Sequence, residues 1–294
     1  MLPMRLRCRL RCVARCRLDL SGLALLLSIG LSFDPSAPPG AGGESFPCSN
    51  DEVRSIEAQG SPALAFPTPG GGRCSTTAIG PRVVLTAAHC VANGKRGLVV
   101  TRSGIRRSMI CSHPPRRWPE RAAASPAGGI DSDAHDLALC ELDEPLETEP
   151  LARVAVLDAQ LPPGTELRIL GFGCGTDEQA RSSCRKGRVT GSNPEEPATR
   201  PGTLEIETRA CYGDSGAGAY LLVDGQDSWT VVGVVSHSDL DRFTYVVPLA
   251  SSGFREWATA WSAEHGVTIC GLQGEGAGAC TKPTDSPDSP PILR

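Results

Sequence analysis

Ser215 is the residue whose type and surroundings most clearly suggest nucleophilic chemistry. This serine lies in the stretch Cys-Tyr-Gly-Asp-Ser-Gly-Ala-Gly at residues 211–218. A serine hydroxyl is a weak nucleophile until a neighbouring base takes its proton. Glycines on both sides allow a sharp turn, which can aim backbone N–H groups at a developing oxyanion. The stretch by itself indicates acyl transfer only weakly, because glycine-rich serine turns are common.

Two upstream stretches could supply the missing partners. His89 follows the apolar run Leu85-Thr86-Ala87-Ala88, and Asp136 opens the run Leu137-Ala138-Leu139. An imidazole can accept a proton near neutral pH and later return it. A carboxylate can hold that imidazole in one tautomer and stabilise its protonated form. Asp131 and Asp133 are nearby alternatives, but only Asp136 leads directly into an apolar run that could carry it into the interior.

The motifs LTAAHC, DLAL and GDSG, in this chain order, resemble those of the chymotrypsin/trypsin family of serine endopeptidases over roughly residues 70 to 262. The resemblance implies an all-β fold of two six-stranded antiparallel β-barrels with a C-terminal helix. It implies that His89 is the general base, that Asp136 orients it and that Ser215 is the nucleophile. The backbone N–H groups of Gly213 and Ser215 would form the oxyanion hole. It implies no cofactor and no metal ion.

Arg209 stands six residues before Ser215, where trypsin-like members of the family keep an acidic residue. A cation at the floor of the specificity pocket would repel lysine and arginine side chains, so trypsin-like cleavage is disfavoured. Ser236, His237 and Ser238 resemble the segment that forms the pocket wall. Together with Arg209 they could bind an acidic side chain.

A second interpretation of Arg209 stays open. Its guanidinium could pair with Asp239 or Asp241, which would leave the specificity pocket blocked or unselective.

Short β-branched runs, separated by glycine, proline or asparagine, predict many short strands and therefore a barrel or sandwich. They cover residues 78–79, 83–85, 98–100, 167–170, 203–207, 219–223, 230–236 and 244–247. The stretch 252–261 has Phe254, Trp257, Ala258 and Trp261 at helical spacing, which predicts a helix with one buried face. The family resemblance implies that this helix packs on the second barrel.

Residues 1–43 are predicted to be a secretory signal peptide and a linker. Six arginines within the first 17 residues precede an apolar segment, Leu20–Leu31, that is too short for a comfortable membrane span. A buried helix and an uncleaved anchor are the alternatives. Residues 44–72 are expected to be an N-terminal segment or propeptide, 73–270 the protease domain, and 271–294 a tail that is disordered from residue 281.

No activation sequence of the usual kind is present. Members of the family begin the mature chain with an aliphatic dipeptide and two glycines, and that terminus inserts beside the acid before the nucleophile, here Asp214. The nearest candidate for such a cut is Arg54-Ser55-Ile56. We expect Asp214 to pair with a buried positive charge, because a buried acid needs a partner.

Charge and cysteine content favour a secreted protein. Without residues 1–43 the chain keeps 23 basic and 31 acidic residues, which argues against nucleic acid as a partner.

Ten of the 13 cysteines remain, and an even number in an exported chain predicts disulfides. No CxxC pair occurs among them, which disfavours zinc. The resemblance implies a bond between Cys74 and Cys90, proximity suggests Cys174 with Cys184, and the other pairings stay open: Cys48, Cys111, Cys140, Cys211, Cys270 and Cys280.

The sequence thus predicts a secreted, monomeric serine endopeptidase acting on proteins or peptides, with no stable attachment to a membrane once the signal is removed. One alternative is a protease homologue without activity that binds protein partners. Another is an α/β-hydrolase esterase. Ala217 leaves the G-x-S-x-G motif of those esterases incomplete, and strands do not alternate with long helices.

Overall fold

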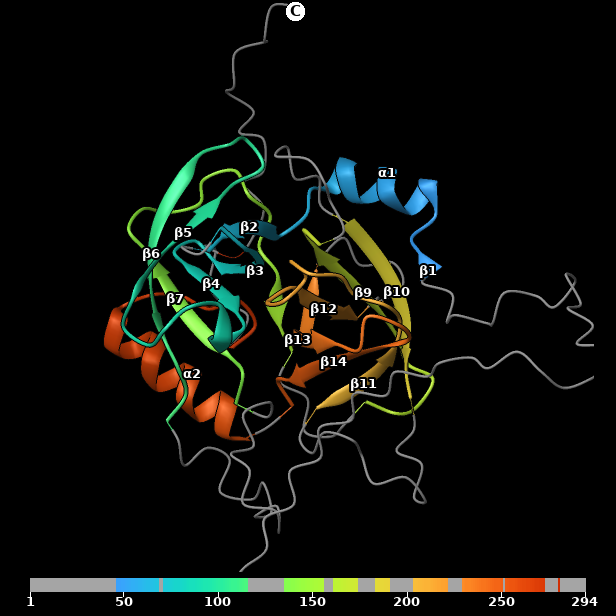
Figure 1. Cartoon of the computed structure of the whole chain (residues 1–294). Coiled ribbons are helices and arrows are strands. Elements are labelled where there is room, and N and C mark those ends of the chain that lie inside the picture. The colour runs from blue at the N-terminus through green and yellow to red at the C-terminus, as the bar shows by residue number, and fades with distance from the viewer. Residues whose placement is uncertain are drawn as a thin grey trace, which may run out of the picture. The chain divides into compact units, whose positions relative to one another are not determined.

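The computed structural model describes residues 46–68, 71–115, 135–155, 161–173, 183–190, 203–221, 229–250, 252–272 and 280. The first six-stranded barrel closes in the order β2-β3-β4-β7-β6-β5 (Figure 1). Its strands are Ala63–Pro67 (β2), Arg73–Gly80 (β3), Val83–Thr86 (β4), Arg96–Val100 (β5), Arg106–Ser112 (β6) and Ala138–Leu142 (β7).

The second barrel follows the order β10-β11-β14-β13-β12-β9 and closes through the pairing of β9 with β10. Its strands are Glu166–Gly171 (β9), Ser183–Val189 (β10), Leu204–Glu207 (β11), Gly218–Leu221 (β12), Thr230–Ser238 (β13) and Phe243–Pro248 (β14). Two short strands join its edges: Phe46–Pro47 (β1) pairs with β10, and Arg153–Val154 (β8) pairs with β13. The predicted all-β class with two six-stranded antiparallel barrels is confirmed.

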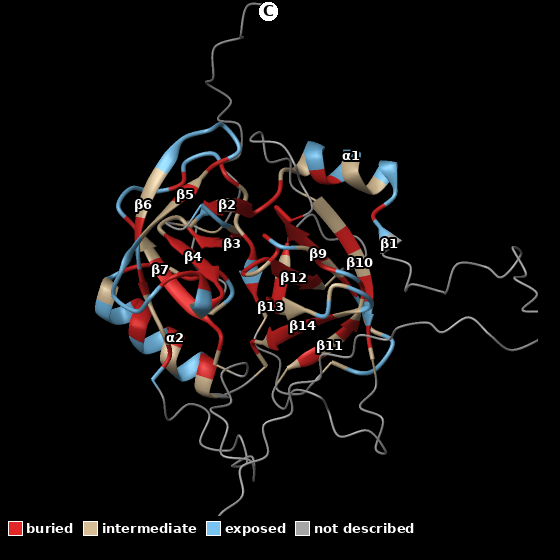
Figure 2. Ribbon diagram, viewed as in Figure 1, coloured by how far each residue is buried: buried red, intermediate tan, exposed pale blue. Residues whose placement is uncertain are grey.

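The C-terminal helix α2, Ser252–His265, lies beside β7 of the first barrel (Figure 1), whereas the resemblance had implied that it packs on the second barrel. Phe254, Ala258 and Trp261 are buried in an apolar cluster that includes the strands of the first barrel and extends into the second. The imidazole Nδ1 of His265 lies 2.8 Å from a carboxylate oxygen of Glu141 on β7. Figure 2 shows that the strands of both barrels are mostly buried, while α1 and α2 keep one exposed face.

The barrel begins upstream of residue 73, where the sequence predicted the start of the protease domain. Strand β2 belongs to the closed barrel, and helix α1, Asn50–Gln59, precedes it. The sequence ALAFP of β2 carries no strong alternation and ends in proline, which hides the strand from a pattern search. Beyond residue 270, Cys280 is tied back to Cys270 by a disulfide. The expected signal peptide and the expected disordered tail lie outside the described residues.

Neither of the two helices in the described part of the chain has the length and apolar character needed to cross a bilayer.

Candidate active site

His89 is presented by the first barrel at the end of a buried strand. Strand β4 leads into a short 3-10 turn, Ala88–Cys90, and the disulfide between Cys74 and Cys90 fixes this turn to β3. The flanking residues Ala87 and Cys90 are buried, while the side chain of His89 is 49% exposed. The turn therefore holds the imidazole at the surface of a rigid core.

Asp136 lies just before β7, where the buried Leu137 carries it inward. Its Oδ1 accepts the backbone N–H of His89 at 2.8 Å, and its Oδ2 lies 2.7 Å from Nδ1 of His89. The hydroxyl of Ser236 also donates to Oδ2, at 2.6 Å. Burial alone would raise the pKa of Asp136. The hydrogen bonds from His89 and Ser236 and the attraction of the imidazole outweigh burial, so that its pKa lies below the usual value.

The ionised carboxylate decides the tautomer of His89. A carboxylate can only accept hydrogen bonds, so Nδ1 carries the proton and Nε2 of the neutral ring is left with a lone pair. That nitrogen is the one available to take a proton from a nucleophile.

Ser215 lies in the tight turn between β11 and β12 of the second barrel. Its hydroxyl donates to the carbonyl of Ser236 at 3.4 Å. Gly216, at φ +83°, must be glycine, because a Cβ there would lie 2.2 Å from the carbonyl oxygen of Ser75. The turn is thus pressed against the first barrel.

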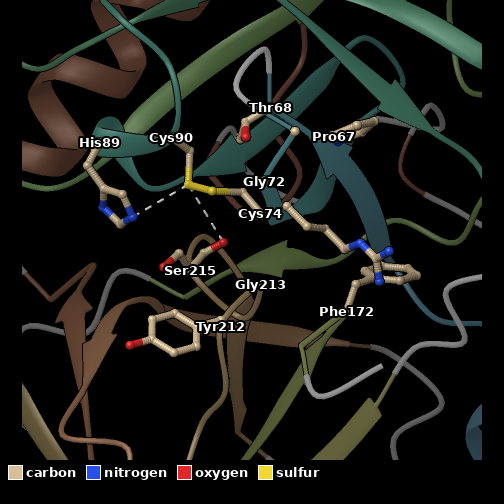
Figure 3. A pocket seen from close by; sticks show the side chains of 12 residues that line it. Pro67, Thr68, Gly72, Cys74, His89, Cys90, Phe172, Tyr212, Gly213 and Ser215 are labelled. Carbon is tan, nitrogen blue, oxygen red and sulfur yellow. Dashed lines mark hydrogen bonds between the residues drawn. A yellow bond between two sulfur atoms is a disulfide. The ribbon is translucent and has the colours of Figure 1, made fainter. Parts of the chain in front are cut away.

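His89 and Ser215 line one cavity of about 730 Å³ (Figure 3). The Sγ atom of Cys90 lies 3.7 Å from Nε2 of His89 and 3.8 Å from the carbonyl oxygen of Ser215. The same sulfur atom therefore contacts both the histidine and the serine segment, which places them beside each other. The structure brings together the three residues that the motifs singled out.

Gly213 and Ser215 are the two residues whose backbone N–H groups the resemblance assigns to an oxyanion hole. Gly213 has φ +103°, a conformation that favours glycine, and both residues line the cavity. Neither N–H donates to another group in the part of the chain that the structure describes. Two unpaired donors beside a serine hydroxyl can bind a developing oxyanion.

Ser75 is a residue of this site that the sequence did not indicate. Its hydroxyl donates to the carbonyl of Gly213 at 2.7 Å and accepts the N–H of Phe172 at 2.9 Å. Its backbone N–H donates to the carbonyl of Ser215, also at 2.7 Å. Ser75 follows Cys74 on β3, so it fixes the serine turn of the second barrel to the first. No motif marks a lone serine in a strand, and only its contacts identify it.

A family model described as Trypsin matches residues 53–257 of this chain. The chain belongs to the trypsin family. The family assignment agrees with the two barrels, with the cavity that His89 and Ser215 line, and with the contact of Asp136 with His89.

Relatives of this trypsin-family chain are distant. It is 30% identical over 202 residues to transmembrane protease serine 11E of Mus musculus, covering 58% of the chain and 44% of that protein, so it spans less than half the length of this relative. The crystal structure of scabies mite inactivated protease paralogue S-I1 is similar with a TM-score of 0.52 and 16% identity, over 76% of this chain and 99% of that one. Human heparin binding protein is similar with a TM-score of 0.49 and 19% identity, over 68% and 90%.

Two of the residues expected to bind substrate, Arg209 and Ser238, do not have the positions in a specificity pocket that the resemblance implied. Arg209 is exposed and does not lie buried at the floor of a pocket. The hydroxyl of Ser238 donates to the carbonyl of Phe243 and accepts the N–H of Leu240, so it holds a turn.

Ser236 and His237, the other two expected pocket residues, contact groups on the inner side of the site. Ser236 supports Asp136, and the ring of His237 stacks on Tyr245 with a centroid distance of 4.6 Å. His237 Nδ1 also lies 3.2 Å from the Ser236 hydroxyl. As far as the structure describes its lining, the cavity at Ser215 includes none of Arg209, His237 and Ser238.

The disulfides correct one prediction. Cys184 is bonded to Cys48, 136 residues earlier, and not to Cys174, which lies outside the described residues. The β1–β10 pairing brings the two together, a contact that closeness in sequence cannot indicate. Other bonds join Cys74 to Cys90, as the resemblance implied, Cys111 to Cys140 and Cys270 to Cys280, and Cys211 is also disulfide-bonded.

Cys74, His89 and Cys90 lie close enough together to surround a metal ion. Both sulfurs are already joined in a disulfide and offer no thiolate, so this group fits no zinc ion.

Proposed function

We propose that this chain is a serine endopeptidase that hydrolyses peptide bonds through an acyl-enzyme on Ser215. The observation that carries the proposal is the chain of contacts around one buried carboxylate. Asp136 accepts from His89 and from Ser236, and Ser215 bonds the carbonyl of the same Ser236 beside the cavity. Three motifs from distant parts of the sequence thereby share one site, in a chain of the trypsin family.

The reaction follows from the roles of these groups. Nε2 of His89 takes the proton of the Ser215 hydroxyl while Oγ attacks the scissile carbonyl carbon. The N–H groups of Gly213 and Ser215 bind the oxyanion of the tetrahedral intermediate. The C–N bond then breaks as His89 returns the proton to the leaving amine. Water, activated by the same histidine, hydrolyses the ester and restores Ser215.

The substrates are proteins or peptides, and cleavage after lysine or arginine is slow. Arg209 replaces the acid that would attract a basic side chain, and its exposed guanidinium adds positive charge close to the serine turn. The chain acts as a monomer outside the cytoplasm, where its disulfides persist. It needs no cofactor and does not act on nucleic acid.

Labelling with a fluorophosphonate tests the proposal. The reagent should modify the oxidised, folded protein at Ser215, and Ser215→Ala should abolish the label. Ser103→Ala serves as the matched control and should label normally, because it removes an exposed hydroxyl that does not line the cavity at Ser215. A peptide library then reads out specificity, and rapid cleavage after lysine or arginine would refute the assignment of Arg209.

A protease homologue that binds proteins without cleaving them is the second candidate. The fold suits both, since one similar structure is that of an inactivated protease paralogue. Absence of labelling in a folded sample with intact Ser215 and His89 would favour this candidate.

A further inference from the structure

The carboxylate of Asp214, directly before the proposed nucleophile, is held by groups inside the protein. Its side chain is 1% exposed. Oδ1 accepts the N–H of Gly173 at 2.8 Å, and Oδ2 accepts the N–H of Cys211 at 2.9 Å. The Nε atom of Arg185 forms an ion pair with Oδ2 at 3.4 Å. An uncompensated charge at this depth would be strongly destabilising, and Arg185 is the cation that compensates it.

Arg185 is itself buried, and Gly171 and Gly173 pack closely against the carboxylate of Asp214. Its side chain is 10% exposed, and Nη1 donates to the carbonyl of Arg209 at 3.4 Å. A Cβ placed on Gly173 would lie 2.4 Å from Cγ of Asp214, and one on Gly171 would lie 2.4 Å from its Oδ1. The ion pair and the bond to Arg209 therefore hold residues 209–214, the segment that leads into the serine turn, and neither glycine could carry a side chain beside the carboxylate.

Residues 46–59, which we name the N-terminal strap, hold the strand that carries Arg185 (Figure 1). In the β1–β10 pairing Pro47 lies opposite Arg185, and the neighbouring Cys184 is bonded to Cys48. On the other side of Arg185, Lys186 pairs with Glu52 of the strap at 3.1 Å. The strap is thus bonded to Cys184 and paired with Lys186, the residues on both sides of Arg185.

We propose that the strap stays attached in the active enzyme. In this protein the cation that pairs with Asp214 is Arg185, and not an N-terminal ammonium freed by cleavage. This pair keeps residues 209–214 in the conformation that catalysis needs. This inference rests on the proposed peptidase function. Arg54-Ser55-Ile56, the nearest candidate for an activation cut, lies inside helix α1 with Ile56 buried, so a cut there would break the strap and free no terminus that Asp214 needs.

The first test asks whether the uncut protein is active. The full chain is expressed with oxidised disulfides, and intact-mass analysis identifies the fraction that still contains residues 46–59. This fraction should label with fluorophosphonate and hydrolyse peptides as fast as any shorter form. Activity that appears only after cleavage between Cys48 and Ala63 would overturn the inference while leaving the peptidase function standing. Failure of both forms to label would instead overturn the peptidase function itself.

The second test replaces Arg185. Arg185→Gln should lower kcat by about tenfold to a hundredfold per titrated active site, the range of losing part of an oxyanion hole. It should weaken a peptide boronate inhibitor in proportion, while KM changes little. Arg185→Lys should restore part of kcat. Arg168→Gln is the matched control, because Arg168 also pairs with a strap residue, Glu52 at 2.7 Å, but does not contact Asp214.

Thermal unfolding separates the two explanations of a weaker variant. A merely structural role for Arg185 would lower the melting temperature of Arg185→Gln and leave kcat per active site and boronate binding unchanged, which would overturn the inference. Where Arg185→Gln does not fold, the neutral variant Arg185→Met decides: a kcat per active site equal to that of the parent protein also overturns the inference.

Discussion

At the scale of single residues, Ser236 connects the carboxylate of Asp136 to Ser215, the proposed nucleophile. Its hydroxyl donates to Asp136 and its carbonyl accepts from Ser215. Ser236→Ala should lower kcat/KM about tenfold, since one hydrogen bond to a charged group is lost. Because that bond helps to lower the pKa of Asp136, the pKa should rise toward its usual value. The pH profile of kcat/KM measures both effects.

Ser262→Ala is the control for this variant. Ser262 is also buried and donates at 2.6 Å, but to the carbonyl of Val267 beside helix α2. It should lose stability without losing kcat. Equal activity of Ser236→Ala and Ser262→Ala would contradict the positioning role of Ser236.

Ser75 also acts at the scale of single residues, because its hydroxyl holds Gly213, a residue of the proposed oxyanion hole, against the first barrel. Ser75→Ala removes the donor to Gly213 and the acceptor for Phe172, and should cost about 1–3 kcal/mol of unfolding free energy. It should also reduce kcat more than KM, because Gly213 loses its anchor. Thr76→Val is the matched control: Thr76 is buried next door, but its hydroxyl reaches only the carbonyl of Leu64 at 3.5 Å. Identical kinetics for the two variants would contradict the role of Ser75.

At the scale of elements, helix α1 is held to the second barrel chiefly by Glu52. Burial by itself would raise the pKa of Glu52. Bonds from Ser49 and Lys186 and the charge of Arg168 instead lower it to about 2. A depressed pKa means that the stabilisation is complete above the unfolded value of 4.5 and is lost as the pH falls toward 2.

Glu52→Gln should therefore destabilise the protein at pH 7 by about 1–2 kcal/mol. The difference between variant and parent should shrink as the pH falls from 4.5 toward 2, as urea unfolding at several pH values would measure. Glu57→Gln changes a carboxylate on the same helix that is exposed, and should leave stability unchanged. A constant difference across this pH range would contradict the assignment.

At the scale of the whole molecule, a buried hydrogen bond joins the two barrels: the Thr77 hydroxyl on β3 lies 3.0 Å from that of Tyr220 on β12. Burial raises the pKa of Tyr220 well above its usual value, although the bond from Thr77 opposes this, so the phenol stays neutral. Tyr220→Phe should lower the unfolding free energy by about 1–2 kcal/mol, because Thr77 loses its partner.

The unfolding of Tyr220→Phe should remain a single transition, since the apolar cluster that includes Leu64 and Phe254 continues into Val231 of the second barrel. Urea unfolding followed by fluorescence and by circular dichroism measures this. Two separated transitions would show that the hydrogen bond, and not the apolar cluster, couples the barrels.

Helix α1 was not predicted from the sequence, although one of its signals could have been recognised there. Its capping box, Ser49 with Glu52, is a readable start signal. Yet Ile56 is its one buried residue, so the sequence carries no apolar period there. Helix α2, with three buried residues at helical spacing, was predicted correctly, but its choice of barrel was not.

The sequence by itself determined the family and the two-barrel class, and it singled out His89, Asp136 and Ser215 as the proposed catalytic residues, because each lies in a short motif whose chemistry depends on immediate neighbours. Only the tertiary structure decided that Cys48 bonds Cys184, that Arg185 neutralises Asp214 and that Ser75 anchors Gly213. Such partners are far apart in the chain. Which of many cysteines, arginines or serines reaches them depends on strand register and barrel closure, which no local pattern encodes.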